Sequence, residues 1–280
     1  MFVTRFAPSP TGRLHRGHAF SALTAYAAAQ AAGGRFILRI EDIDTGRCRP
    51  VYEAGIFDDL DWLGLRWETP VWRQSQRRSA YAGALDHLRR GGLLYRCFRT
   101  RNSAIEAIAR APHGAVETSA PGPLAPDKES AMLAEGRPFA WRLSLVAAHR
   151  ALGGFEGLGF LESGAGPKGE TGMIPADPAR SGDVVVARKD LGVSYHLAVV
   201  VDDAAQNVTH VIRGCDLFEA AHVQRLLQAL LDLPAPVYHH HPLILRPDGR
   251  RYAKRDTAET LADLRAQGVT PVALRAALGF

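Results

Sequence analysis

Short apolar runs alternate with amphipathic stretches along the first third of this chain of 280 residues. Apolar runs at 2–6 and 35–40 predict buried strands, and the Ala-rich stretch 17–32 between them predicts a helix. Apolar residues at helical spacing predict two further helices, one that begins at Pro50 and one over 76–90. Strands that alternate with helices in this way indicate an α/β fold with a parallel sheet.

The composition changes over the middle third, where Gly, Pro, Ala and Ser are frequent and one alternating run, 139–146, predicts a strand. We therefore expect a smaller α+β domain at 96–182, inserted into a Rossmann-like domain that 1–95 and 183–280 form together. After the insert, the pattern predicts strands at 184–187, 197–201, 208–212 and 237–245, a helix at 218–231 and two short helices at the end.

Composition narrows the class of protein without identifying a partner. Hydrophobic residues make up 46% of the chain, which is enough for a large core. No apolar run is long enough to span a membrane, the start does not resemble a secretory leader, and three scattered cysteines do not suggest a disulfide framework. We therefore expect a cytoplasmic protein without membrane contact. The net charge of +5 permits a nucleic-acid partner, but biased use of Arg explains it equally well.

The densest chemistry lies where the first predicted strand leads into the first predicted helix. Residues 5–18 read RFAPSPTGRLHRGH. A turn before a helix binds anions, because the first N–H groups lack partners and the helix dipole favours negative charge. His15 and His18 add donors, and Gly17 lets a ligand approach the backbone closely. The segment predicts a phosphate site like those at the strand–helix turns of doubly wound α/β folds. The alternative is that both histidines only donate hydrogen bonds to nearby backbone carbonyls.

Four segments resemble, in their order, the glutamyl-tRNA synthetase family of class I aminoacyl-tRNA synthetases. They are 6–18, RIEDID at 39–44, SYHLAVVVDD at 194–203 and IRG at 212–214. The first alone would be weak, because some nucleotidylyltransferases share its His-x-Gly-His pattern. Together they imply a class I catalytic core that uses ATP with Mg²⁺. The residues that the resemblance implies for ATP binding are Pro8, Thr11, Gly12, His15, Gly17, His18 and Lys254.

The resemblance also implies a pocket for L-glutamate, formed by Arg5, Ala7, Ser9, Glu41, Tyr195 and Arg213. The chemistry agrees, since a dicarboxylate with an ammonium group needs two cations and one anion. Arg5, Arg213 and Glu41 supply that set. The alternative is that Glu41 only pairs with Arg39 or Arg47 at the edge of the sheet.

A second signature lies in the basic turn RRYAKRD at 250–256. Relatives normally carry Lys-Met-Ser-Lys or Lys-Leu-Ser-Lys here, whereas this chain has Arg251 for the first Lys and Ala253 for the Ser. Lys254 matches the last Lys. The resemblance implies that Lys254 closes on the ATP phosphates and, with the two histidines, acts as a catalytic residue while pyrophosphate leaves. Taken alone, the turn would be a solvated basic loop.

Two segments invite a metal interpretation, and we expect neither to bind a metal. Cys97 stands where many relatives begin a zinc knuckle, but Arg99 replaces the second thiolate, so zinc is expected to be absent. His239, His240 and His241 lie in a predicted strand, where neighbours point to opposite faces and at most two imidazoles converge. A structural strand end is the better interpretation.

The chain ends soon after Lys254, before the position of the helical anticodon-binding domain of a full glutamyl-tRNA synthetase. This length resembles the glutamyl-queuosine tRNA(Asp) synthetases, a family that activates glutamate and esterifies it to the queuosine at the wobble position of tRNA(Asp). The resemblance implies a ligase, expected as a monomer, with glutamate, ATP and queuosine-bearing tRNA(Asp) as partners. Three alternatives stay open: a truncated enzyme that charges tRNA(Glu), a ligase with a small-molecule acceptor, and an inactive relative that binds RNA.

Overall fold

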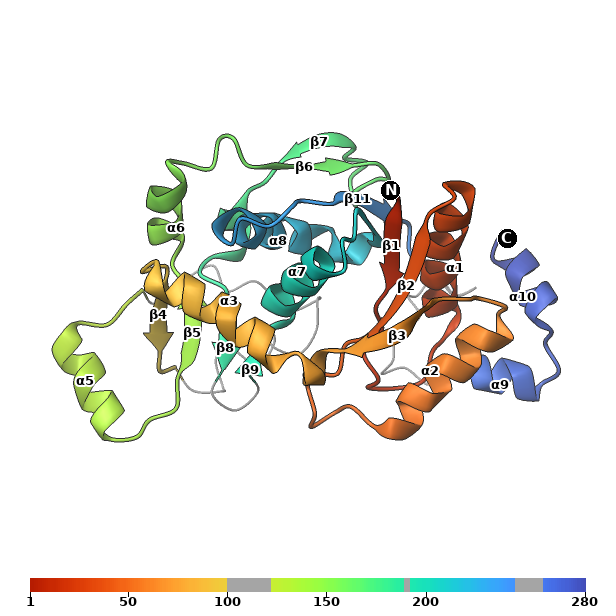
Figure 1. Cartoon of the computed structure of the whole chain (residues 1–280), viewed down its shortest axis with the longest axis horizontal. Helices are drawn as coiled ribbons and strands as arrows, with labels where there is room; N and C mark the ends of the chain where they lie inside the picture. Colours follow the sequence, from red (N-terminus) through yellow and green to blue (C-terminus); the bar gives the residue numbers. More distant parts are fainter. Residues whose placement is uncertain (100–121, 189–191, 245–258) are drawn as a thin grey trace.

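The protein is built around a seven-stranded sheet in the order β3-β2-β1-β10-β11-β6-β7 (Figure 1). The computed structural model describes residues 1–99, 122–188, 192–244 and 259–280. All neighbouring strands are parallel except β6 and β7, which form an antiparallel pair. The strands are β1 Val3–Phe6, β2 Arg35–Ile40, β3 Glu68–Arg73, β6 Gly159–Glu162, β7 Gly172–Pro175, β10 His210–Gly214 and β11 Val237–His241. The predicted α/β fold with a parallel sheet is confirmed.

A smaller antiparallel sheet lies beside the large one, in the order β4-β5-β8-β9 (Figure 1). Its strands are β4 Leu94–Cys97, β5 Ala140–Leu143, β8 Val185–Arg188 and β9 Gly192–Val193. Strand pairing crosses the expected limits of the insert at 96–182, because β6 and β7 join the large sheet while β8 and β9 join the small one. The division into domains stays a prediction.

Helices cover both faces of the large sheet. One buried cluster includes side chains of α1 Arg16–Ala31, α2 Pro50–Trp62, α9 Leu261–Ala266 and α10 Pro271–Ala277. The other includes side chains of α3 Arg78–Arg90, α6 Leu145–Leu152, α7 Tyr195–Ala205 and α8 Phe218–Leu230. Neighbouring strand residues point to opposite faces, and Val211 and Ile212 of β10 join different clusters. The helices predicted at 17–32, from Pro50, at 76–90 and at 218–231 are confirmed.

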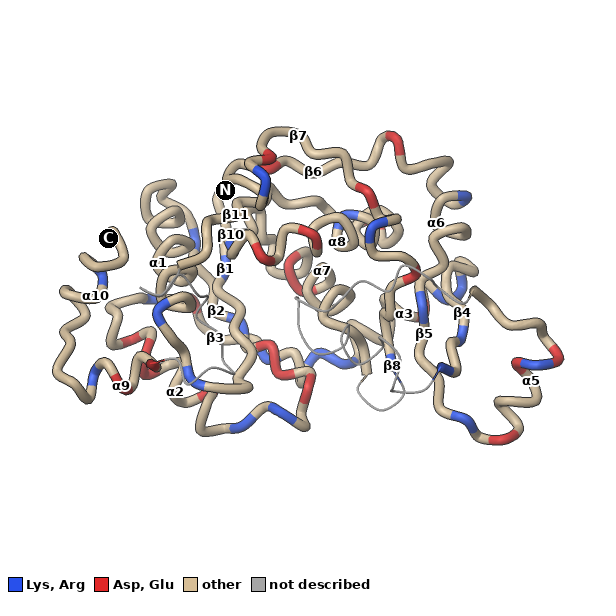
Figure 2. The backbone as a smooth tube through the Cα atoms, turned by 180° about the vertical axis from the view of Figure 1, so that it is seen from behind, with Lys and Arg blue, Asp and Glu red and all other residues tan. Residues whose placement is uncertain are grey.

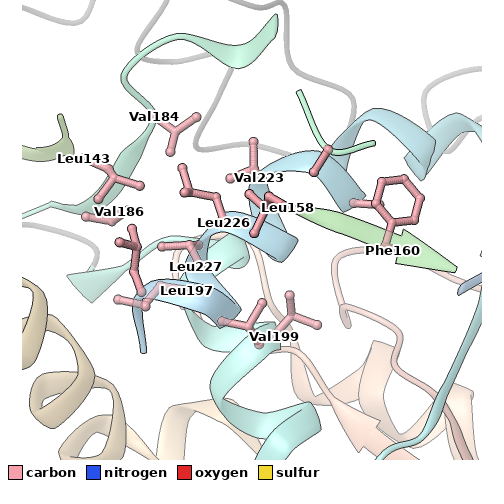
Figure 3. Close-up of a cluster of buried hydrophobic side chains, with 14 of the residues drawn as sticks. Leu143, Leu158, Phe160, Val184, Val186, Leu197, Val199, Val223, Leu226 and Leu227 are labelled. Atoms are coloured by element: carbon pink, nitrogen blue, oxygen red, sulfur yellow. The ribbon is translucent and has the colours of Figure 1, made fainter. Parts of the chain in front are cut away.

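The prediction of a strand at 197–201 is wrong, because these residues form the middle of α7. Ser194 caps this helix by accepting a hydrogen bond from the N–H of Leu197 at 3.4 Å. Leu197 and Val199 pack into the buried cluster of Figure 3, and four consecutive residues, 197–200, are buried. The run 197–201 is uniformly apolar, so its periodicity does not distinguish a helix from a buried strand. The strand predicted at 139–146 is also shorter, since β5 ends at Leu143.

Candidate active site

Three neighbouring strands bring predicted glutamate-binding residues to one edge of the large sheet. Arg5 lies near the carboxyl end of β1, Glu41 follows β2 directly, and Arg213 lies near the carboxyl end of β10. The strand order reverses between β1 and β10, and doubly wound sheets bind ligands outside the carboxyl ends of strands at such a switch point. Segments that are far apart in the sequence therefore meet where this architecture offers a ligand site.

A buried network of charges holds Arg5 and Glu41. The fully buried Arg39 contacts Glu41 at 3.0 Å and Asp203 at 2.7 Å, and Asp203 also accepts from Nε of Arg5 at 3.2 Å. Burial raises the pKa of Glu41, while Arg39 and Arg5 oppose that shift. Burial would also raise the pKa of Asp203, but Arg5 and Arg39 hold it below its usual range. The sequence left open whether Glu41 pairs with Arg39. The structure has this ion pair, and both side chains are buried.

Arg213 lies at the same edge, and one nitrogen of its guanidinium has no hydrogen-bond partner among the residues that the structure describes. Its Nε donates to Nε2 of His240 at 3.0 Å, and its Nη1 donates to Oε1 of Gln224 at 2.9 Å. The third nitrogen, Nη2, is buried and has no hydrogen-bond partner among the described residues, and the same holds for the amide nitrogen of Gln224. Buried donors without partners are costly. This pair therefore suits a ligand with several acceptor oxygens, such as a carboxylate.

Tyr195 and His196 begin α7 close to Arg213. Burial raises the pKa of Tyr195, and the charges of Arg213, Glu41 and Arg5 also act on its hydroxyl, so this group lies among the predicted pocket residues. Burial, and then the charge of Arg213, lower the pKa of His196 to about 4. The imidazole is therefore neutral at pH 7, and its Nδ1 is buried without a partner in the described part of the chain.

His15 and His18 form the start of α1, as a phosphate site at this helix requires. The N–H of Gly17 donates to Nδ1 of His15, and the N–H of His15 donates to Nδ1 of His18, both at 3.2 Å. The two rings stack with their centroids 3.8 Å apart. Since each Nδ1 accepts, each neutral ring carries its hydrogen on Nε2. The helix start therefore carries two imidazole donors, while the N–H of Gly17 already donates to the ring of His15.

The turn before α1 joins the predicted glutamate and phosphate sites. The carbonyl of Pro8 accepts from the N–H of Glu41 at 3.0 Å, which ties the turn to the end of β2. Within the turn, the N–H of Thr11 donates to the carbonyl of Ser9 at 2.8 Å. The other predicted contact residues of this turn are Ala7 and Gly12.

Lys254 lies outside the described residues, but both flanks of its segment reach α1 or its start. On one side, Nε2 of His241 lies 2.9 Å from Oγ of Ser21 on α1. On the other side, Thr260 forms an isolated β-bridge with His15. The described residues that flank 245–258 therefore both contact α1 or its start.

The described residues contain neither a candidate metal site nor a candidate membrane-spanning helix. Cys97 is a buried free thiol in β4. Outside the three undescribed stretches, no group of three or more His, Cys, Asp or Glu side chains could hold a metal ion. No described helix has the length and hydropathy to cross a bilayer. The absence of zinc stays a prediction.

Several residues of this site were missed by sequence reasoning. Asp203 lies inside 194–203, which resembles the family, but the sequence does not indicate its bonds to two arginines. Gln224 and His240 gave no signal, because one lies on an ordinary amphipathic helix and the other in a run of three histidines. The pairing of β10 with β11 brings His240 to Arg213, and the packing of α8 brings Gln224 there.

A family model for the catalytic domain of class I tRNA synthetases (E and Q) matches residues 1–118 and 171–280. The chain belongs to the class I glutamyl- and glutaminyl-tRNA synthetase family. It is 47% identical to the glutamyl-Q tRNA(Asp) synthetase of Rhodobacter capsulatus, over 99% of this chain and 100% of that protein. It is 38% identical to glutamate–tRNA ligase 2 of Dinoroseobacter shibae, over 98% of this chain and 60% of that ligase.

Among solved structures, this class I synthetase resembles a glutamate tRNA ligase from Elizabethkingia meningosepticum, crystallised in complex with its amino acid. The TM-score is 0.72 and the identity 29%, over 91% of this chain and 52% of that one. The chain thus spans about half the length of that ligase. The predicted family, fold class and assignment to the ligases are confirmed.

Proposed function

We propose that this synthetase activates L-glutamate with ATP and transfers it to the queuosine of tRNA(Asp). The observation that carries the glutamate half is the buried Nη2 of Arg213, which has no hydrogen-bond partner in the described part of the chain and lies at the sheet edge that also holds Arg5 and Glu41. The queuosine half is supported by the R. capsulatus relative, whose full length aligns with nearly all of this chain.

Arg5 and Arg213 are the proposed partners of the two glutamate carboxylates, and Glu41 is the proposed partner of the ammonium group. Tyr195 adds one O–H bond, and Ala7 and Ser9 complete the pocket. Support comes from the charge set itself, because two guanidinium groups and one carboxylate complement an amino dicarboxylate.

In the first step, an α-carboxylate oxygen of glutamate attacks the α-phosphorus of ATP, and pyrophosphate leaves. His15, His18 and Lys254 are the proposed catalytic groups, which hold the phosphates together with the N–H groups at the start of α1. They stabilise the charge that develops on the leaving group, so no covalent protein nucleophile is needed. Mg²⁺ enters with ATP. The other proposed ATP contacts are Pro8, Thr11, Gly12 and Gly17.

In the second step, a hydroxyl of the queuosine cyclopentene diol attacks the carbonyl carbon of the glutamyl-adenylate. The new ester bond forms, the bond from the carbonyl carbon to the phosphate oxygen breaks, AMP leaves, and the hydroxyl proton passes to water. We further propose a cytoplasmic monomer without structural zinc, in which 1–95 and 183–280 form the catalytic domain and 96–182 the insert.

The proposal is tested with labelled glutamate, ATP and tRNA from two strains, one that makes queuosine and one that does not. We expect glutamate-dependent ATP–pyrophosphate exchange without tRNA, and label only in tRNA that contains queuosine. Equal labelling of both preparations would contradict the queuosine acceptor. Labelling of tRNA(Glu) would indicate a truncated charging enzyme, and the absence of both exchange and label would indicate an inactive relative.

A further inference from the structure

A chain of buried polar contacts runs from the β6–β7 hairpin to Arg213. Oε1 of Glu162, the last residue of β6, accepts from the backbone N–H groups of His240 and Gly164 at 2.9 and 2.8 Å. Its other oxygen, Oε2, lies 2.5 Å from Nδ1 of His240. The opposite ring nitrogen, Nε2, accepts from Nε of Arg213 at 3.0 Å. The side chains of Glu162 and His240 are fully buried, so water does not compete for these bonds.

The hydrogen bonds determine the protonation states of Glu162, His240 and Arg213. The guanidinium of Arg213 only donates, so Nε2 of His240 must offer its lone pair, and the ring hydrogen must lie on Nδ1, where it donates to Glu162. Burial lowers the pKa of His240 to about 4, although Glu162 opposes the shift. Burial would raise the pKa of Glu162, but its bonds from His240 hold it below its usual range. At neutral pH the chain is carboxylate, neutral imidazole and guanidinium.

We propose that Glu162 and His240 are positioning residues for the glutamate carboxylate, acting through Arg213; this inference rests on the proposed function. Glu162 selects the tautomer of His240 that accepts from Nε, and Gln224 holds Nη1. With two nitrogens fixed, the buried Nη2 is directed to the ligand. A guanidinium that is oriented before binding loses less rotational freedom when it meets a carboxylate.

The sequence position of Glu162 makes this role unexpected. Glu162 lies in 119–170, between the two stretches that the family model matches. It reaches the site because β6 pairs with β11, where Tyr238 is its register partner, two residues before His240. The approach is so close that a side chain at Gly164 would collide with the backbone of His240. Thus a segment outside the family match supplies the buried end of a contact chain that leads to the glutamate site.

The first test identifies the tautomer directly. In ¹⁵N NMR spectra of the wild-type protein, with His240 assigned by difference from His240→Asn, Nδ1 should be protonated and Nε2 should not. Glu162→Gln keeps the size of the side chain and its acceptor for the two backbone N–H groups, but its amide must donate to Nδ1. The ring hydrogen then moves to Nε2, where it faces a donor of Arg213. The same tautomer in both proteins would overturn the proposal.

The second test separates glutamate from ATP by their KM values in ATP–pyrophosphate exchange. Glu162→Gln should raise the KM for glutamate about tenfold to hundredfold, the range of one hydrogen bond to a charged group, and leave the KM for ATP nearly unchanged. Tyr238→Phe is the matched control in the same buried wall, because it keeps the ring that lies beside Arg213 and His240 and removes the hydroxyl, which accepts from Gln228 at 3.1 Å. It should change the KM for glutamate less than about twofold.

Two substitutions of His240 test its two ring nitrogens separately. His240→Asn can still donate to Glu162 but has no atom at the position of Nε2, whereas His240→Gln places an acceptor near that position. We therefore expect the Gln variant to keep a lower KM for glutamate than the Asn variant. Equal increases in KM for glutamate and ATP in Glu162→Gln would indicate a merely structural role and overturn the proposal. Absence of exchange in the wild-type protein would instead overturn the proposed function, and with it the role in glutamate binding.

Discussion

Single residues at the sheet edge differ in how much of their charge is already neutralised. Arg5 contacts the carboxylate of Asp203, whereas the hydrogen bonds that Arg213 makes to described residues go to the neutral acceptors of His240 and Gln224. A guanidinium that is bonded to neutral groups offers its full charge to a ligand carboxylate. Arg213 should therefore be the larger contributor to glutamate affinity.

Arg213→Lys tests this difference, because Lys keeps the charge but cannot bond two neighbours and a carboxylate in one plane. We expect the KM for glutamate in ATP–pyrophosphate exchange to rise at least about tenfold. Arg180→Lys serves as the control, since this exposed side chain pairs with Glu219 at the surface. An unchanged KM in Arg213→Lys would remove Arg213 from the pocket.

His15→Asn separates the capping role of this residue from its proposed role in catalysis. Asn is an effective N-cap and can replace Nδ1 as the acceptor for Gly17, but it lacks the Nε2–H donor. We expect an unchanged Tm and a loss of about 10²- to 10³-fold in the exchange rate. His15→Ala should lose both the rate and about 1 kcal/mol of stability. Full activity in His15→Asn would show that the imidazole only caps the helix.

Residue identity predicted part of this site. Arg5, Glu41 and Arg213 could be proposed from sequence because the charges of glutamate demand complementary side chains. Glu162 and Gln224 could not, because their roles depend on strand pairing and helix packing that bring distant segments together. His240 looked like a strand end until its partners were known.

At the scale of elements, the C-terminal helices pack against α2. Nη2 of Arg265 on α9 contacts Oδ1 of Asp59 on α2 at 2.8 Å, and Asp59 is 2% exposed. Burial raises the pKa of Asp59 to about 6, although Arg265 opposes the shift. The burial of the Asp59 carboxyl therefore makes the junction between α2 and α9 sensitive to pH.

The pH dependence has a defined sign. Between the unfolded pKa of 3.8 and the folded pKa of about 6, the folded state holds a proton that the unfolded state has released. The free energy of unfolding should therefore fall by about 3 kcal/mol from this group as pH rises through that range, and level off above it. Urea titrations at several pH values should show that Asp59→Asn removes this fall.

Asp61→Asn is the matched control, because Asp61 lies on the same helix with a side chain that is 68% exposed. It should retain the pH dependence of the native protein. If Asp59→Asn showed the same fall in the free energy of unfolding as the native protein, the raised pKa of Asp59 would be contradicted.

Helices whose sequence alternates polar and apolar positions at helical spacing were predicted well, and a uniformly apolar stretch was not. The amphipathic helices α3 and α8 show polar and apolar positions at helical spacing, so the sequence alone indicates them. The helix α7 has no such contrast over 197–200, and it was mistaken for a strand. Likewise, the pairing of β6 with β11 leaves no mark in either strand.

At the scale of the whole molecule, charge does not indicate where RNA binds. Figure 2 shows Lys and Arg interspersed with Asp and Glu along the described chain, and the basic residues do not gather in one region. The four family segments, in contrast, converge on one sheet edge and one helix start. The overall architecture was therefore predictable from resemblance, whereas the acceptor is inferred from the relatives.

Glutamate activation and transfer to queuosine are separable, and the acceptor distinguishes this proposal from a glutamate–tRNA ligase. Mass spectrometry of the nucleosides of tRNA(Asp), after incubation with the protein, ATP and glutamate, examines the acceptor itself. The account predicts that queuosine is converted to its glutamyl ester and that the 3′-terminal adenosine stays unmodified. Unchanged queuosine, with glutamate on the terminal adenosine or on no nucleoside, would contradict it.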